Sequence, residues 1–143
     1  MKEHITLQAR SESLNLHRIR IIRNYLDHDT CRTIVQALVI SHLDYANAIL
    51  MGLPACDINT LQRVQNRAAK LVLRESKFAG AKVCLKSLHW LPINQRIKHK
   101  VLSLVFKSLN GDAPQYLKNL LREAPKSKYR LQITDFHKIK KSH

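Results

Sequence analysis

Residues 57–74, DINTLQRVQNRAAKLVLR, indicate what kind of fold to expect. Their apolar side chains recur every three or four residues, at Ile58, Leu61, Val64, Ala68 and Leu71. This spacing places them on one face of an α-helix. The segment therefore predicts an amphipathic helix that packs its apolar face against the rest of the domain.

The same helix carries a row of basic residues on another face. These residues step by four, three and four positions: Arg63, Arg67, Lys70 and Arg74. Like charges at this spacing repel one another by about 0.2–0.5 kcal/mol per pair. An anionic partner lying against the helix would remove that repulsion. The alternative interpretation is a solvated face on a basic protein.

Helical patterns flank this segment on both sides, at about 5–26, 31–51, 81–88, 92–109 and 114–121. Only three glycines and four prolines occur in 143 residues, which is too few turn residues for an all-β protein. We therefore expect an all-α, single-domain bundle of about five helices over residues 1–121. Lysines crowd residues 122–143 while the apolar periodicity fades, which predicts a basic, poorly ordered tail.

The two N-terminal helices have distinct apolar patterns. In the first, four residues recur at roughly helical spacing: Leu14, Ile21, Ile22 and Tyr25. The second is apolar nearly all round, which is typical of the buried centre of a bundle. Either Asp29 or Thr30 is expected to cap this second helix, because a short side-chain oxygen accepts from the free N–H groups of the first turn.

Polar and aromatic residues within the apolar segments are assigned to the scaffold: Asp44, Tyr45, Asn47 and Trp90. In the last long helix, the inward face is predicted to hold Ile93, Ile97, Val101, Leu104, Val105 and Leu109. Gly111 is expected to close that helix, since glycine adopts the left-handed conformation readily.

The charge of the chain is high and unevenly distributed. Lys and Arg number 25 against 10 Asp and Glu, a formal charge of +15, yet 45% of the residues are hydrophobic, which excludes a disordered polycation. Between residues 61 and 86 seven bases face one acid. A second basic row follows at Arg96, Lys100 and Lys107. This distribution predicts contact with a nucleic-acid backbone through phosphates, without reading of sequence.

Several other classes of function and location are disfavoured by the sequence. No apolar run approaches the ~20 residues that span a bilayer, and the first residues lack the apolar core of a secretory signal. The three cysteines, Cys31, Cys56 and Cys84, are odd in number and widely spaced, which favours a reducing compartment. We expect an intracellular protein, of the nucleus or the cytoplasm, with no membrane partner.

The sequence offers no recognisable catalytic or cofactor site. His and Cys lack metal-ligand spacing, the lone glycines form no phosphate loop, and no adjacent pair of aspartates exists. Cys31 lies near a helix start, where a thiol pKa can fall, but an inert thiol is the favoured interpretation. We therefore expect no enzyme activity, no metal, no cofactor and no small-molecule substrate.

Several segments, in their order and spacing, together resemble one family. They are ALVISHLDYANAIL at 37–50, GLP at 52–54, LQRVQNRAAKLV at 61–72, LHWLP at 88–92 with Arg96, Ile97 and Lys100 following, and GDAPQYL at 111–117. They are similar to the thumb, and the segment after it, of the reverse transcriptases of LINE-type (Jockey-like, non-LTR) retrotransposons. The resemblance covers about residues 14–121. His42 departs from it where a basic residue is usual, and Ala46 where Cys is common.

The resemblance implies descent from an RNA-directed DNA polymerase. The family's aromatic-x-Asp-Asp motif and its upstream aspartate, which hold two Mg²⁺ ions, have no counterpart in this chain, so a non-catalytic fragment is implied. Residues 1–121 would then be a thumb-like domain and 122–143 a basic tail. In the family the thumb grips the template–primer duplex through its backbone, which agrees with the basic rows.

The candidate nucleic-acid-binding residues are thus Arg63, Arg67, Lys70 and Arg74, followed by Arg96, Lys100 and Lys107. The implied partners are RNA, DNA or an RNA–DNA hybrid, and a reverse transcriptase palm is a further candidate partner. Two alternatives stay open: a helical protein-interaction module, and an inert translated fragment with no binding role.

Overall fold

The computed structural model describes residues 2–45 and 47–121, and no strand occurs in these ranges. The helices are α1 (Lys2–Ile22), α2 (His28–Val35), α3 (Ser41–Asp44), α4 (Ala55–Leu73), α5 (Ala81–Ser87), α6 (Ile93–Asn110) and α7 (Gln115–Leu120). Short helical segments of other types lie at Arg23–Tyr25, Gln36–Ile40 and Asn47–Leu50. The all-α prediction is confirmed for the described part of the chain.

The chain divides into two units, Met1–Leu104 and Val105–His143. The hydrophobic core of buried residues lies wholly in the first unit, because its members run from Ile5 to Ile97. The predicted tail, 122–143, lies outside the described residues. The predicted boundary after residue 121 stays a prediction.

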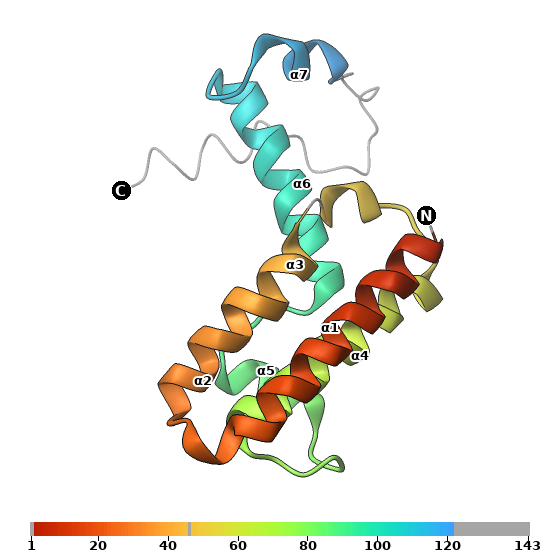
Figure 1. The fold of residues 1–143 in the computed structure, drawn as a ribbon. Coiled ribbons are helices and arrows are strands. Elements are labelled where there is room, and N and C mark those ends of the chain that lie inside the picture. The colour runs from red at the N-terminus through yellow and green to blue at the C-terminus, as the bar shows by residue number, and fades with distance from the viewer. Residues whose placement is uncertain (1, 46, 122–143) are drawn as a thin grey trace. The chain divides into compact units, whose positions relative to one another are not determined.

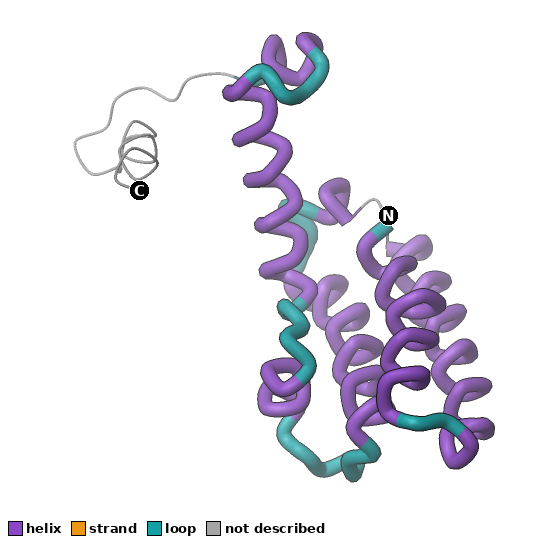
Figure 2. The backbone as a smooth tube through the Cα atoms, turned by 90° about the vertical axis from the view of Figure 1, so that its left-hand side faces the viewer, coloured by secondary structure: helices purple, strands orange, loops and turns teal. Residues whose placement is uncertain are grey.

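Helix α4 is the central element of the first unit. It packs against α1, α2 and α5, and Figures 1 and 2 show it beside α1. Its apolar face is fully buried at Leu61, Val64, Ala68, Ala69 and Val72. The amphipathic helix predicted for residues 57–74 is thus present, and it takes the central place that the sequence had suggested for residues 31–51.

Residues 31–51 do not form one helix. A π-helical turn at Gln36–Ile40 separates α2 from α3, α3 ends at Asp44, and a 3₁₀ turn follows at Asn47–Leu50. A π-turn holds an extra residue, so it rotates the buried stripe around the helix. Val39 and its neighbour Ile40 are therefore both buried, while Leu38 and Ile49 are exposed. The rotation explains why the segment seemed apolar all round.

The cap of α2 differs from the prediction as well. Asp27, not Asp29 or Thr30, is the N-cap, and its Oδ2 accepts from the backbone N–H groups of Asp29 and Thr30 at 3.1 Å each. Hydrogen bonding to Thr30 holds the pKa of the Asp27 carboxyl below its usual value. The cap lies two or three residues earlier than predicted because α2 begins at His28.

Helix α1 packs through a different face from the one its spacing suggested. Leu14, Ile21, Ile22 and Tyr25 are exposed, whereas the buried side is Ile5, Ala9, Glu12, Leu16 and Ile19. The buried Glu12 accepts from Asn15 Nδ2 at 3.2 Å and lies 2.9 Å from His42 Nδ1. Gln8 Nε2 donates to the His42 backbone oxygen at 2.7 Å. The buried face of α1 therefore combines apolar residues with a carboxylate that has polar partners.

The C-terminal end of α4 and the segment 23–26 that follows α1 lie together and are joined by two arginines. The buried Arg23 donates to the backbone oxygens of Leu71 and Val72 at 2.9 and 2.8 Å. Arg74 donates in return to the backbone oxygens of Arg23 and Leu26 at 3.4 Å each. Helix ends leave carbonyl groups without intrahelical partners and carry partial negative charge, so the Arg23 guanidinium group is well placed at the end of α4. We call this pair the arginine clasp.

The second unit holds the end of α6 and α7. Gly111 follows α6 with φ +83, which confirms that it closes this helix. Pro114 is the N-cap of α7, with its ring just outside the first turn. Leu109, predicted to face inward, is 44% exposed in the structure.

Candidate nucleic-acid interface

The middle of α4 presents its basic row to solvent. Arg63 and Arg67 are exposed, directly opposite the buried apolar face of the helix. Within the described residues no acidic side chain pairs with either of them; Arg67 Nε only reaches the backbone oxygen of Arg63, at 3.4 Å. With a rise of about 1.5 Å per residue, these two guanidinium groups lie about one turn apart. They are free to contact successive anionic groups.

The two basic residues near the C-terminal end of α4 differ from Arg63 and Arg67 because both make contacts with other parts of the chain. Lys70 is half-buried and its Nζ donates to the backbone oxygen of Lys77 at 2.6 Å, so the loop at 75–80 folds back onto the helix. Arg74 stands just beyond the helix in the left-handed conformation, with φ 56, and belongs to the arginine clasp. Three of the four predicted residues thus share one face, and Arg74 has a structural role.

Lys77 adds a positive charge beside this row that the sequence analysis did not single out. Its ammonium lies 5.0 Å from the centroid of the Phe78 ring, and Phe78 is exposed. The signal was present in the count of bases between 61 and 86. The folding back of the loop was not visible in the sequence, because it depends on the contact between Lys77 and Lys70.

The predicted row on α6 is not a single site. Arg96 pairs with Asp44, and its Nε donates to the backbone oxygen of Leu91 at 3.0 Å. Lys100 is exposed in the first unit, whereas Lys107 lies in the last turn of α6, in the second unit. Arg96 therefore holds the scaffold, and of the predicted row only Lys100 is available on this part of α6.

Two glutamines of α4 position the segment that leads into α6. Gln65, fully buried, donates from Nε2 to the Leu91 backbone oxygen at 2.8 Å. Gln62 Oε1 accepts from the backbone N–H of Ile93 at 2.8 Å, and its Nε2 donates to Gln65. The sequence analysis missed both residues, because nothing in a single sequence distinguishes a glutamine that faces a neighbouring segment from one that faces water.

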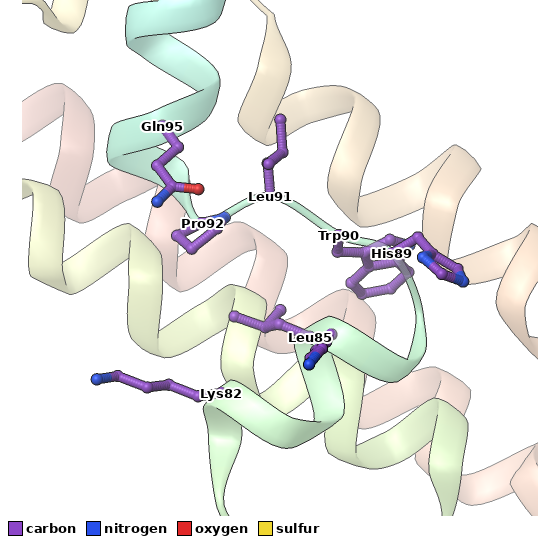
Figure 3. A pocket seen from close by; sticks show the side chains of 8 residues that line it. Lys82, Leu85, His89, Trp90, Leu91, Pro92 and Gln95 are labelled. Carbon is purple, nitrogen blue, oxygen red and sulfur yellow. The ribbon is translucent and has the colours of Figure 1, made fainter.

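The segment held in this way borders an open hollow between α5 and the start of α6, which we call the Trp90 hollow (Figure 3). Its volume is about 380 Å³, and its wall is mostly apolar. The residues that line it are Lys82, Leu85, Lys86, His89, Trp90, Leu91, Pro92 and Gln95. No acidic residue is among them.

Trp90 and Asn47 each carry a buried polar atom without a hydrogen-bond partner in the described structure. These atoms are the indole Nε1 of Trp90 and Oδ1 of Asn47. Asn47 lines a second, more polar hollow with Asp44, His99 and Lys100. The scaffold role predicted for Asp44, Asn47 and Trp90 agrees with their burial or pairing, whereas Tyr45 is 84% exposed.

The described residues give little support for a metal site, a reactive thiol or a membrane-spanning helix. No group of three or more His, Cys, Asp or Glu side chains comes together there in a way that could hold a metal ion. Burial raises the pKa of the Cys31 thiol, with Arg23 and Arg74 opposing the effect, so this thiol is protonated at neutral pH. None of the described helices combines the length and the apolar character needed to cross a membrane.

Comparisons with protein-family models, with curated proteins and with solved structures found no significant match to this chain. The resemblance to the thumb region of LINE-type reverse transcriptases therefore rests on the quoted motifs alone and stays a prediction. Several residues of those motifs make the contacts described above: Asp44, Gln62, Gln65, Leu91 and Arg96.

Proposed function

We propose that this chain is a non-catalytic fragment derived from a retrotransposon RNA-directed DNA polymerase, and that it binds nucleic-acid backbones without reading their sequence. The observation that carries the binding proposal is the exposed face of α4. Arg63 and Arg67 stand opposite the core with no acidic partner among the described residues, and Lys70 and Lys77 extend the positive surface. Such a surface suits phosphates, which attract Lys and Arg irrespective of base sequence.

The origin of the chain is supported by the motifs and by their spatial relation. Asp44 of the segment 37–50 pairs with Arg96, which follows the segment 88–92, and Gln65 of the segment 61–72 donates a hydrogen bond to Leu91. Segments that resemble one family in the sequence thus support one another in the fold. A chain retaining these contacts keeps the structure that places the α4 face, even without a polymerase site.

The proposed binding is tested by a salt titration on a short RNA–DNA duplex. The wild type is compared with a triple variant, Arg63→Ala, Arg67→Ala and Lys70→Ala, after circular dichroism has shown both to be folded. Each phosphate contact contributes about 0.9 to the slope of log affinity against log salt, so we expect the triple variant to lose about two to three units of slope.

A matched control removes three exposed arginines of α1: Arg10→Ala, Arg18→Ala and Arg20→Ala. The net charge changes by the same amount, so this variant should bind more tightly than the α4 variant. Equal losses in the two variants would assign the binding to overall charge and reject the α4 face. Unchanged binding by the α4 variant would reject it as well.

A second candidate function, protein binding, is favoured by an exposed apolar row on α1. Leu7, Leu14 and Ile21 are spaced by seven residues and are 64%, 56% and 66% exposed. Arg10 and Arg18 flank the row, so an acidic amphipathic helix is the partner that this surface suits. Binding that survives high salt but is lost on Leu14→Glu, a change on the exposed side of α1, would support this function over nucleic-acid binding.

A further inference from the structure

The loop at 75–80, which joins α4 to α5 in Figure 1, presents an aromatic ring to solvent. Phe78 is 86% exposed, so its ring gains little from burial. Its backbone N–H donates to Ser76 Oγ at 3.3 Å, and the bond from Lys70 Nζ to the Lys77 backbone oxygen ties the loop to α4. The exposed ring is therefore carried by a turn that hydrogen bonds hold against the helix.

The surroundings of this ring are positively charged. The Lys77 ammonium lies 5.0 Å from the centroid of the Phe78 ring, and the high exposure of the residue leaves most of the ring accessible. Through Lys70, the loop is joined to the exposed basic row of α4. Seven bases face one acid, Glu75, between residues 61 and 86. An anionic partner that lies along the α4 row therefore reaches the ring.

Exposure alone does not single out Phe78. Tyr25 and Tyr45 are 89% and 84% exposed. Tyr25 stands two residues before Asp27, and Tyr45 directly follows Asp44, so each of these rings has an acidic neighbour in the chain. Phe78 instead combines an exposed ring with adjacent positive charge. A polyanion that carries flat rings along its backbone is a nucleic acid, and single strands bind proteins through these two kinds of contact.

We propose that Phe78 is a stacking platform for one unpaired base of a single-stranded nucleic acid, with the adjoining phosphate at Lys77. The rest of the strand follows the basic row of α4 toward Arg67 and Arg63. In a duplex each base is already paired and stacked on its neighbours, so the ring selects unpaired nucleotides. This inference rests on the proposed function, because it adds a base contact to a surface proposed to bind phosphates.

The test compares an eight-residue oligothymidylate with an abasic oligomer of the same length and charge. Fluorescence anisotropy of the labelled oligomers measures their binding to the wild type, Phe78→Leu and Phe78→Tyr. Leucine keeps an apolar side chain without a flat ring, whereas tyrosine keeps the ring. Stacking on one aromatic side chain changes affinity about tenfold, so Phe78→Leu should bind the oligothymidylate about tenfold more weakly and the abasic oligomer as the wild type does. Phe78→Tyr should bind both as the wild type does.

Two further variants separate the ring from the charge beside it. Tyr45→Leu removes an equally exposed ring elsewhere and should leave both affinities unchanged. Lys77→Ala should weaken the binding of both oligomers and lower the salt slope by about 0.7, the value for one phosphate contact on a single strand. Phe78→Leu should leave that slope unchanged. Because all the altered side chains are exposed, we expect these variants to fold, and circular dichroism checks this.

The outcomes distinguish this inference from the function on which it rests. Salt-dependent binding of the oligothymidylate that is equal in the wild type and Phe78→Leu would overturn the stacking platform and leave the phosphate-binding function standing. An equal loss for both oligomers in Phe78→Leu, or a tenfold loss in Tyr45→Leu, would overturn it as well, because the effect would then not be base stacking at this ring. Absence of binding to both oligomers and to the RNA–DNA duplex would reject both proposals.

Discussion

The two polar sides of α4 differ sharply in what their residues do. On one side, Gln62 and Gln65 hold the segment that leads into α6, and Gln65 is fully buried. On the other, Arg63 and Arg67 face solvent. These residues alternate within a stretch of six, so composition does not distinguish them.

The difference shows that helical phase determines the role of a polar residue here. Each residue of an α-helix turns the side chain by about 100°, so neighbours such as Gln62 and Arg63 leave the helix in different directions. A charged or amide side chain on this helix has a structural role if it points toward another segment of the chain. Such a side chain is available to bind a partner if it points into solvent.

The largest effect on stability is expected from the glutamine side. Gln65→Ala removes a buried side chain and its hydrogen bond to Leu91, so we expect a loss of about 2–3 kcal/mol in the free energy of unfolding. Arg63→Ala, two residues earlier, should stay within about 0.5 kcal/mol. Urea unfolding followed by circular dichroism measures both. Similar losses in the two variants would remove the contrast between the sides of α4.

The next effect extends the comparison to α6, where Arg96 and Lys100 lie one turn apart. Arg96→Ala breaks the pair with Asp44 and the hydrogen bond to Leu91, and we expect a loss of about 1–2 kcal/mol because the pair is partly exposed. Lys100→Ala should be neutral for stability. Thermal unfolding of the two variants at the same pH measures the difference in their stability. If Arg96→Ala were as stable as the wild type, Arg96 would belong with the residues that only face solvent.

A smaller effect is expected at Arg74, where the basic row meets the arginine clasp. Arg74→Ala loses two long hydrogen bonds and should cost about 1 kcal/mol. Arg74→Gly loses the same bonds but relieves the left-handed backbone, so it should be more stable than the alanine variant by about 0.5–1 kcal/mol. Chemical denaturation measures the stability of both variants. Equal stability of the alanine and glycine variants would contradict the expected relief of the left-handed backbone.

The smallest effect concerns Asp27, an acidic residue whose role is structural. Its folded-state pKa lies below the ordinary 3.8, so the stabilisation is fully present above 3.8 and is lost as pH falls through the lower folded-state pKa. Asp27→Asn keeps a capping oxygen without a titrating group. The stability of the wild type relative to Asp27→Asn should therefore decline only in the acid range. A difference constant down to pH 2 would refute this assignment.

Much of the helical order followed from the sequence. The period of residues 57–74 predicts α4 within two residues of its observed start, and Gly111 marks the end of α6 correctly. Both cases depend on local rules, namely the spacing of apolar side chains and the conformational freedom of glycine. Local rules can be seen in a single sequence.

The sequence was a poorer guide to which face of each helix packs inward, because that depends on contacts between distant residues. The inside face of α1 includes Glu12, whose burial is stabilised by Asn15 and His42. The π-turn at Gln36–Ile40 rotates the buried stripe of its helix. Neither a buried carboxylate nor an inserted residue leaves a periodic signal that a single sequence reveals.

The candidate site divides in the same way. The exposed position of Arg63 and Arg67 follows from the helical period alone, since they lie opposite the apolar face. The engagement of Arg96 by Asp44 and the hollow beside Trp90 depend on how separate helices meet. Basic residues can be counted from the sequence, but which of them are free is a property of the tertiary structure.

The arginine clasp has a consequence for the motions of the native protein. Helix ends are ordinarily the first parts to fray, and their amide hydrogens exchange with solvent early. Arg23, just after α1, holds the last carbonyls of α4, while Arg74, just after α4, holds the carbonyls of Arg23 and Leu26, about 50 residues away along the chain. Neither end can unwind without releasing its counterpart. Amides in the last turn of α4 and in the segment 23–26 that follows α1 should therefore exchange together, as one cooperative unit.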